Sequence, residues 1–392
     1  MENKVLEKIV NNKNEKNDNV VYGVYNNVNE PFLVRFNDFL IDKSKVSLKD
    51  KSYFFHMLAV MLNAGIPLVK ALSALKKRSE NKRFSRVINT ILYNTEQGIS
   101  LADSLLRFED VFDEFEIGIV RAGEATGRLD EMLFKLSEKL DMRNELNQKL
   151  WSASVYPIVV FCVLIVVASV MMFFVFPTLL GLFEEGGLGV SSLPLATRIL
   201  YGVQNFIIGF WWAILLVVLF LYAMFWAFVG TENGRMNYDF FKLKIPYLGN
   251  LLRKLYVLNF VDMMSILIES GVFVVKVLEI VEASMKNVVY KASLQEIIYG
   301  IKQGEKISAN MAKYEFLFPS EVVEMIKTGE ASASLSKVSE KISAQYQKEV
   351  DFSLKKFTSI FEPMMIVVVG LFVAILALAI MGPIFNLSSS AL

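Results

Sequence analysis

The stretch IVRAGEATGRL, residues 119–129, has a second copy in MIKTGEASASL, residues 325–335. The two stretches align without a gap, and each residue of the first lies 206 positions before its match. The identical positions are Gly123, Glu124, Ala125 and Leu129, which recur as Gly329, Glu330, Ala331 and Leu335. Self-similarity at a fixed offset indicates an internal duplication, so the fold has to accommodate the same unit twice.

The duplication extends well beyond this turn. FFHMLAVMLNAGIPLVKAL, residues 54–72, matches FVDMMSILIESGVFVVKVL, residues 260–278, at the same offset. Because EQGIS resembles KQGEKIS, we expect a two-residue insertion after Gly304 in the second copy. The other matched positions are Gly65 with Gly271, Asn81 with Asn287, Gln97-Gly98 with Gln303-Gly304, Phe112 with Phe318, Pro157 with Pro363, and Pro177 with Pro383.

The composition indicates a membrane protein. The chain is 54% hydrophobic, and its mean hydropathy of +0.42 is too high for an ordinary soluble protein. An uncharged run of about 20 residues is long enough to cross a hydrocarbon core of about 30 Å as a helix. The stretches without Asp, Glu, Lys or Arg are residues 150–183, 199–231 and 363–392. We therefore predict three membrane spans.

The positions of lysine and arginine predict how these spans are oriented. The cations next to the predicted cytoplasmic ends are Arg143 and Lys149, then Arg235, Lys242 and Lys244, then Lys348, Lys355 and Lys356. The loop between the first two spans contains only Arg198, and the tail after the third contains no charge. The N-terminus is therefore expected in the cytoplasm and the C-terminus outside. Both copies of the repeated span then run outward, and the unmatched middle span returns the chain.

Helical periodicity dominates after the first 45 residues, so we predict an all-α fold with about six helices in each of two homologous bundles. Helices are expected near 54–62, 82–96, 100–107, 112–122 and 128–148. The predicted domains are a polar N-terminal arm (1–45), a first cytoplasmic helical domain (46–150), a transmembrane helix (151–180), an extracytoplasmic loop (181–206), a second transmembrane helix (207–230), a second cytoplasmic helical domain (231–360), a third transmembrane helix (361–386) and an extracytoplasmic tail (387–392).

The arm is rich in asparagine and poor in apolar residues, which indicates weak order. Within it, VVYGVY at 20–25 and FLVRF at 32–36 are candidates for short strands.

Five features in a fixed order, each present twice, resemble the inner-membrane platform protein of type IV pilus and type II secretion machines, the F-domain family. The resemblance covers about residues 46–386. In order, the motifs of the first copy are MLNAGIPL, EQGIS, RAGEATGRL, VYPIVV and VFP, and those of the second are LIESGVFV, KQGEKIS, KTGEASASL, FEPMMI and MGP.

This resemblance implies a function at the bacterial inner membrane. Members of the family dock a cytoplasmic hexameric ATPase, and its motion is thought to reach the membrane through them, so that pilin or pseudopilin subunits join a filament. The implied partners are that ATPase, the pilins, other inner-membrane machine components and lipids, and a homo-oligomer is expected because the motor is ring-shaped. The alternatives are a passive membrane scaffold, or an oligomeric channel or transporter component without motor coupling.

The repeated glutamates Glu124 and Glu330 have two interpretations. A carboxylate in a tight turn can bind a cation or a partner's arginine, or it can accept backbone N–H groups and fix a helix connection. We favour the second. Gly65 and Gly271 are expected to stop a helix in the left-handed conformation, and Gly123 and Gly329 to supply positive φ or close helix approach. Pro157 and Pro363, near the starts of spans, are expected to begin or kink a helix.

A cluster of cations distinguishes the first copy from the second. It consists of Lys76, Lys77, Arg78, Lys82, Arg83 and Arg86. A solvated helix face and a contact with anionic lipid or an acidic ATPase surface explain it equally well.

Catalytic signatures are absent from the sequence. It contains no GxxxxGK[ST], HExxH or CxxC motif, and His56 is the only histidine. Its counterpart in the second copy is Asp262, so we expect a half-exposed position. Cys162 is the only cysteine, which excludes a disulfide within the chain. We therefore predict no enzyme activity, no cofactor and no metal, and the balanced net charge of +1 argues against nucleic acid as a partner.

Overall fold

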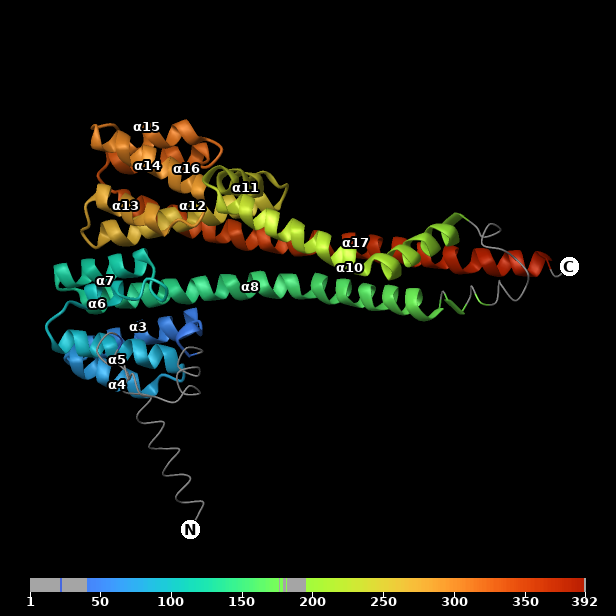
Figure 1. Cartoon of the computed structure of the whole chain (residues 1–392). Helices are drawn as coiled ribbons and strands as arrows, with labels where there is room; N and C mark the ends of the chain where they lie inside the picture. The colour runs from blue at the N-terminus through green and yellow to red at the C-terminus, as the bar shows by residue number, and fades with distance from the viewer. Residues whose placement is uncertain (1–21, 23–40, 176, 179–180, 182–194, 391–392) are drawn as a thin grey trace, which may run out of the picture. The chain divides into compact units, whose positions relative to one another are not determined.

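The computed structural model describes residues 22, 41–175, 177–178, 181 and 195–390. Every regular element among them is helical, which confirms the all-α prediction (Figure 1). The two candidate strands of the N-terminal arm lie outside the described residues, apart from Tyr22, which lies in a turn.

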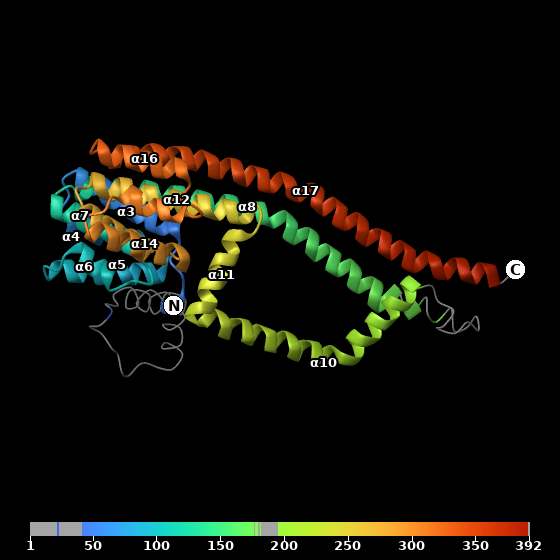
Figure 2. The ribbon, with the colours of Figure 1, turned by 90° about the horizontal axis from the view of Figure 1, so that it is seen from above.

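Each copy of the repeat forms six helices in the same order, as predicted. Figures 1 and 2 show their arrangement. The first helical half contains α3 (Leu48–Asn63), α4 (Leu68–Arg78), α5 (Lys82–Glu96), α6 (Leu101–Leu106), α7 (Glu114–Thr126) and the start of α8 (Leu129–Val170). The second helical half contains α12 (Leu248–Glu269), α13 (Val274–Ser284), α14 (Val288–Lys302), α15 (Ile307–Met311), α16 (Ser320–Ala331) and the start of α17 (Leu335–Ser390). Between the halves lie a π-helical turn (Met171–Val175), α10 (Leu195–Gly230) and α11 (Glu232–Lys244), and a short 3-10 turn (Ala312–Tyr314) follows α15.

The matched residues terminate and begin helices in the same way in both halves. Gly65 (φ +77°) and Gly271 (φ +82°) follow α3 and α12 in the left-handed conformation, as predicted. The side chain of Asn81 accepts the N–H of Phe84 at the start of α5, and Asn287 does the same for α14. These capping bonds satisfy backbone donors that have no partner inside the helix, which explains why these positions are identical in the two copies.

The expected two-residue insertion after Gly304 is wrong. Gly98 (φ +83°) and Gly304 (φ +88°) end equivalent helices, and α6 and α15 begin at Leu101 and Ile307, which keeps the offset of 206. The Ile-Ser pairs of EQGIS and KQGEKIS are therefore identical in sequence without being equivalent in space. The backbone, which turns through the same left-handed glycine in both halves, determines the register.

The core of each half is aromatic, and its matched phenylalanines are fully buried. Phe54 packs edge to face on Phe84, with ring centres 5.4 Å apart. Its match Phe260 packs edge to face on Phe318, the match of Phe112, with ring centres 5.3 Å apart. Such pairs stabilise beyond their buried area. The apolar residues that recur at helical spacing in FFHML and its copy therefore include residues of the buried core of each bundle.

The turn after α16 is strained where its counterpart is relaxed. Gly127 ends α7 with φ +70°, but Ala333 holds the same place with φ +51°. A left-handed residue other than glycine costs about 1–2 kcal/mol. We expect Ala333→Gly to raise the free energy of unfolding by about 1 kcal/mol, and Gly127→Ala to lower it by a similar amount. Denaturation of the purified chain in detergent, followed by circular dichroism, tests this, and changes of the same sign in both variants would contradict it.

Two helices run from a helical half into an apolar span. We expected a helix near 128–148 to end before the first span, but α8 continues through Pro157, and α17 likewise continues through Pro363. Neither proline begins a helix, which corrects that part of the prediction. A proline within an apolar span is tolerated because neighbouring groups can satisfy the freed backbone carbonyl.

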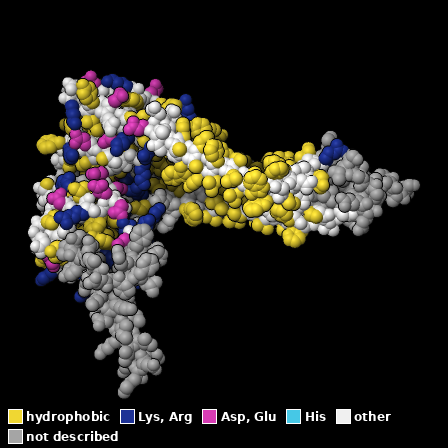
Figure 3. Space-filling view, viewed as in Figure 1, with side chains coloured by type: hydrophobic (Ala, Val, Ile, Leu, Met, Phe, Trp, Pro, Cys, Tyr) yellow, Lys and Arg dark blue, Asp and Glu magenta, His cyan; other side chains and the backbone are white. Residues whose placement is uncertain are grey.

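Among the described residues, three helices are long and apolar enough to cross a membrane, in agreement with the three predicted spans. They lie within Leu129–Val175, Tyr201–Gly230 and Leu335–Leu378. On the face seen in Figure 3, the charged side chains are concentrated on the helical halves, whereas hydrophobic side chains predominate on the long apolar helices. The chain divides into two compact units. Residues 1–148 and 252–349, which include both halves, form one, and residues 149–251 and 350–392, which include the spans, form the other.

Candidate functional site

The repeated glutamates cap a short helix in each half. Glu124, near the end of α7, accepts the N–H groups of Leu101 and Ala102 at 2.6 and 3.0 Å. Glu330 accepts those of Ile307 and Ser308 at 2.6 and 3.1 Å, and it also accepts the Ser308 hydroxyl. The first N–H groups of a helix lack intrahelical partners and lie at the positive end of its dipole, so they favour a carboxylate.

This geometry agrees with the favoured interpretation, in which the carboxylates accept backbone N–H groups at a connection between helices. The connection is the one that precedes α6 in the first half and α15 in the second, 23 residues upstream of each glutamate. The partner of the Gly-Glu turn therefore lies directly after EQGIS in the first copy, and in the Ile-Ser pair that ends KQGEKIS in the second. Among the described residues no group of three or more His, Cys, Asp or Glu side chains is placed to hold a metal ion.

Gly123 and Gly329 permit the close approach of consecutive helices, the second of the two roles expected for them. A Cβ atom at Gly123 would lie 3.0 Å from the Cβ of Met132 on α8. One at Gly329 would lie 3.2 Å from the Cβ of Val338 on α17. The Gly-Glu pair thus combines two functions, since the glycine lets the next helix pack tightly and the glutamate fixes a preceding one.

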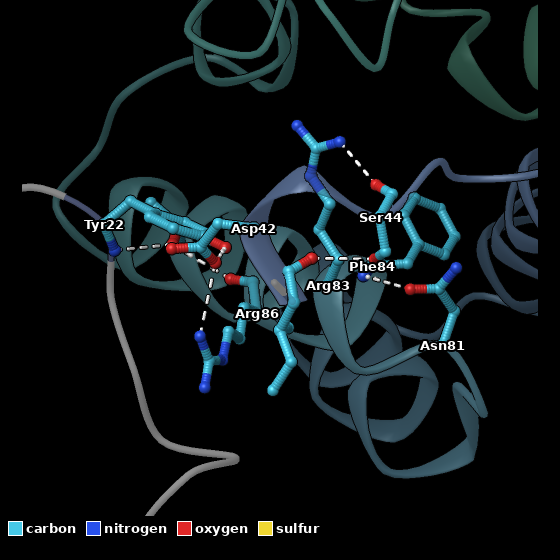
Figure 4. A network of polar contacts seen from close by, with 9 residues as sticks. Tyr22, Asp42, Ser44, Asn81, Arg83, Phe84 and Arg86 are labelled. Carbon is cyan, nitrogen blue, oxygen red and sulfur yellow. Dashed lines mark hydrogen bonds and ion pairs between the residues drawn. The ribbon is translucent and has the colours of Figure 1, made fainter. Parts of the chain in front are cut away.

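The cation cluster does not form one surface. Arg86 is 2% exposed and pairs with Asp42 at 3.2 Å, and Arg83 donates to the Ser44 carbonyl at 2.6 Å and pairs with Asp110 (Figure 4). Both interpretations of the cluster required exposure, so neither applies to Arg86. Lys77, Arg78 and Lys82 are exposed, and Lys76 is partly buried in the last turn of α4.

Arg86 instead takes part in a contact with the N-terminal arm. The Tyr22 N–H donates to the Thr90 hydroxyl at 3.0 Å, and the Tyr22 hydroxyl donates to Asp42, the partner of Arg86 (Figure 4). The Tyr22 ring packs edge to face on Phe108 at 5.7 Å. Burial raises the pKa of Tyr22, and its bond to Asp42 adds to this effect. No feature of the asparagine-rich arm had indicated this anchor.

A buried ion pair lies inside the first half. Lys51 on α3 is 2.5 Å from Glu116 on α7, which is fully buried. The Lys51 ammonium also donates to the Val111 carbonyl at 2.9 Å. Burial raises the pKa of Glu116 to about 7, the charge of Asp113 adds to this rise, and Lys51 opposes it.

In the second half, apolar residues occupy the positions of this ion pair. Val257 and Val322 stand at the positions of Lys51 and Glu116, and both are completely buried. The carbonyl of Leu317, equivalent to that of Val111, accepts the Tyr290 hydroxyl at 2.9 Å, and Tyr290 replaces Phe84. The two cores therefore satisfy one buried carbonyl by different means.

Polar and charged pairs join the two halves to each other. Lys139 on α8 forms an ion pair with Asp262 on α12, and Lys135 pairs with Glu269 at 2.7 Å. Asp262 is 9% exposed, so the expectation of a half-exposed position is wrong for it, whereas its counterpart His56 is half-buried against Phe134. The partner half buries Asp262, and sequence within one copy cannot show that.

The apolar part of this junction lies between α7 and α13, which are side by side in Figure 1. A Cβ atom at Gly118 would lie 3.1 Å from the Cγ2 of Ile280. The Ser270 hydroxyl lies 2.7 Å from the Met132 sulfur. The approach of the second half thus leaves little room for a side chain at position 118.

The first and second spans are joined by a polar bond. The backbone forms a π-helical turn over Met171–Val175, and the Gln204 side-chain amide on α10 donates to the Met172 carbonyl at 3.0 Å. A π-turn displaces carbonyls from their helical partners, and a glutamine amide that satisfies one of them is well suited to an apolar medium. The uncharged-stretch criterion had not identified Gln204, because it considers only ionisable residues.

Comparison with known proteins identifies related chains over most of this length. The family described as type II secretion system (T2SS), protein F, matches residues 54–177 and again 260–383. The type IV pilus assembly protein PilC of Thermus thermophilus is 31% identical over 340 residues, which cover 87% of this chain and 83% of that protein.

Two further relatives cover similar shares. The type IV pilus assembly protein TapC of Aeromonas hydrophila is 28% identical over 347 residues, which cover 88% of this chain and 83% of TapC. The type II secretion system protein F of Pseudomonas aeruginosa is 26% identical over 348 residues, which cover 88% of this chain and 84% of that protein. The family match falls on both helical halves and on the span that follows each of them.

Proposed function

Because the chain belongs to the type II secretion system protein F family, we propose that it is the platform of a type IV filament machine in a bacterial inner membrane, for pilus assembly or type II secretion. Relatives carry both names, and three helices are apolar enough to span a membrane. The observation that carries the proposal is the continuity of α8 and α17, each of which runs from a helical half into an apolar span.

The proposed topology places the N-terminus and both helical halves in the cytoplasm and the C-terminus outside. The lysines and arginines near the spans support this orientation, since cytoplasmic segments retain such cations. The domain boundaries given above, from the arm at 1–45 to the tail at 387–392, belong to the same proposal.

The platform is further proposed to dock a cytoplasmic hexameric ATPase and to transmit its motion to pilin or pseudopilin subunits. In this proposal α8 and α17 carry a displacement of each helical half to the attached span, since each helix is continuous in the chain from one to the other. Two such helices leave the cytoplasmic unit, one from each half. A homo-oligomer provides enough helices to match a ring-shaped motor.

Interruption of α8 tests motor coupling. A run of glycines inserted after Gln148, where the first half meets the span, costs about 1 kcal/mol of helix stability per residue and introduces a flexible joint. We expect a deletion strain to lack surface filaments, the unaltered chain to restore them, and the inserted chain to reach the membrane and co-purify with the ATPase without restoring filaments. Filament counts by electron microscopy and co-purification are the two measurements.

The same insertion between Gly230 and Thr231 is the matched control, because α10 ends there and Thr231 caps α11, so no continuous helix is broken. Filaments should persist in this control. Normal filaments with the insertion after Gln148 would leave a passive scaffold as the better description. Normal filaments in the deletion strain would exclude the platform function altogether.

A further inference from the structure

The two halves pack through different surfaces of the same fold. The first half contributes α7 and α8, whereas the second contributes α12 and α13, which are the counterparts of α3 and α4. Such a head-to-tail contact is heterologous, and among the described residues it leaves one surface of each kind that the other half does not cover. These free surfaces are the α3/α4 face of the first half and the α16/α17 face of the second.

The α3/α4 face carries exposed apolar side chains. Tyr53 is 49% exposed, Val60 44% and Ile66 39%. A hollow of about 440 Å³ lies beside Tyr53 and is lined by Arg78 and Glu80. The equivalent surface of the second half, around Asn259 and Lys286, leaves only about 100 Å³, because Lys139 and Arg143 of α8 line it from the other side.

We propose that the α16/α17 face of one copy of this chain docks on the α3/α4 face of a second copy, and so repeats between chains the contact that joins the halves within one. This inference rests on the proposed topology, in which both halves lie on the same side of the membrane and their spans run in the same direction. Repeats that enter a membrane in parallel are related by rotation about its normal, and a head-to-tail contact repeated by such a rotation gives a ring where the rotation closes.

In the apolar contact of the junction, the first half contributes the small residue and the second half the large one. At the free faces this order of sizes is reversed. Gly118 against Ile280 is a small residue against a large one. The equivalent pair between copies is Glu324 on α16 against Ala74 on α4, a large residue against a small one, and both are exposed. The total volume at the contact is thus preserved, which close packing requires.

The sulfur contact of the junction also has a compatible counterpart. Met132 against Ser270 becomes Val338 against Ala64, a pair of small apolar residues.

The polar contacts change in an equally compatible way. The positions equivalent to the Lys139–Asp262 ion pair are Gln345 in one copy and His56 in the other, and both side chains can form hydrogen bonds. The Lys135–Glu269 pair becomes a contact of Lys341 with Asn63, in which the ammonium can donate to the amide oxygen. None of these four transferred pairs places like charges together, so each of them has an acceptable equivalent between copies.

Disulfide cross-linking in membranes tests this arrangement. The 3.1 Å approach of a Cβ at Gly118 to Ile280 Cγ2 puts this pair within reach of a disulfide, and the equivalent positions are Glu324 and Ala74. In a Cys162→Ala background, a chain with Glu324→Cys and a differently tagged chain with Ala74→Cys are co-expressed and oxidised. We expect a covalent dimer that contains both tags, with a partial decrease of the two monomer bands on a non-reducing gel, because some copies dock on a neighbour of their own kind.

Two controls make the outcome decisive. The Gly118→Cys/Ile280→Cys chain should lose both free thiols to an internal disulfide without a dimer band, as measured by maleimide labelling. Each single-cysteine chain expressed alone should stay monomeric on the gel. The proposal is overturned if the mixed pair does not cross-link while the internal pair does, if single-cysteine chains cross-link to themselves, or if the internal pair does not form. Filament assembly by the Cys162→Ala chain is scored separately, so a failed cross-link with normal filaments rejects this arrangement and leaves the platform function standing.

Discussion

Replacement of Lys51 with valine is expected to lower the free energy of unfolding by about 3–5 kcal/mol, because it leaves the Glu116 carboxylate buried without its partner. Glu116 has no exposed surface, and Lys51 is its only cationic contact among the described residues. The substitution also removes the donor that satisfies the Val111 carbonyl at 2.9 Å. Denaturation of the purified chain in detergent, followed by circular dichroism at 222 nm, measures the loss.

The Lys51→Val/Glu116→Val double variant should be much more stable than Lys51→Val alone. The second half shows that this fold accepts two valines at these positions, since Val257 and Val322 are both buried there. Addition of Phe84→Tyr should recover further stability, because the equivalent Tyr290 hydroxyl satisfies the equivalent carbonyl. A double variant as unstable as the single one would show that the ion pair itself, rather than the isolated charge, determines stability.

The same substitution should change the pH dependence of stability. The folded-state pKa of Glu116 is raised to about 7 from an ordinary value of 4.5, so the folded protein binds a proton more readily than the unfolded chain between these values. Stability from this group is therefore greatest below about pH 4.5 and decreases as the pH rises to about 7. Loss of Lys51 removes an effect that opposes the rise, so Lys51→Val should show a steeper decrease that extends to higher pH. A pH-independent difference between the variant and the unaltered chain would contradict this.

The duplication made much of the fold predictable from the sequence. Positions shared by both copies, such as Gly65 with Gly271 and Asn81 with Asn287, correspond to helix ends and caps. These depend on local backbone geometry, so the same residue serves in both halves. Periodicity and identity therefore revealed the helix order correctly.

The parts that escaped prediction are those in which the copies differ. Lys51 and Asp262 have no identical counterpart, and each acquires its function from a residue distant in sequence. The continuity of α8 was missed for a different reason, because absence of charge defines where a span lies and not where its helix begins. Residues that are identical in the two copies thus indicate the fold that both share. Residues that differ indicate contacts that only one of the halves makes.

Removal of the Glu124 carboxylate is expected to destabilise the first half by about 2 kcal/mol, since two hydrogen bonds to a charged acceptor are lost and the partly exposed site reduces their worth. Glu124→Gln should recover only part of this, because its single carbonyl oxygen accepts one N–H group and its NH₂ group faces another donor. Glu330→Ala should cost more than Glu124→Ala, because Glu330 also accepts the Ser308 hydroxyl. The measurement is again denaturation followed by circular dichroism.

A matched substitution separates this structural function from a cation site. Glu145→Gln, at an exposed position on α8, should leave stability within about 0.5 kcal/mol of the unaltered chain. If Glu124 and Glu330 bound a divalent cation, added calcium or magnesium would raise the midpoint of unfolding of the unaltered chain, and EDTA would lower it. Because each carboxylate already accepts two backbone N–H groups at 2.6–3.1 Å, we expect neither effect. A cation-dependent midpoint that disappears in Glu124→Gln would instead restore the binding interpretation of the repeated turn.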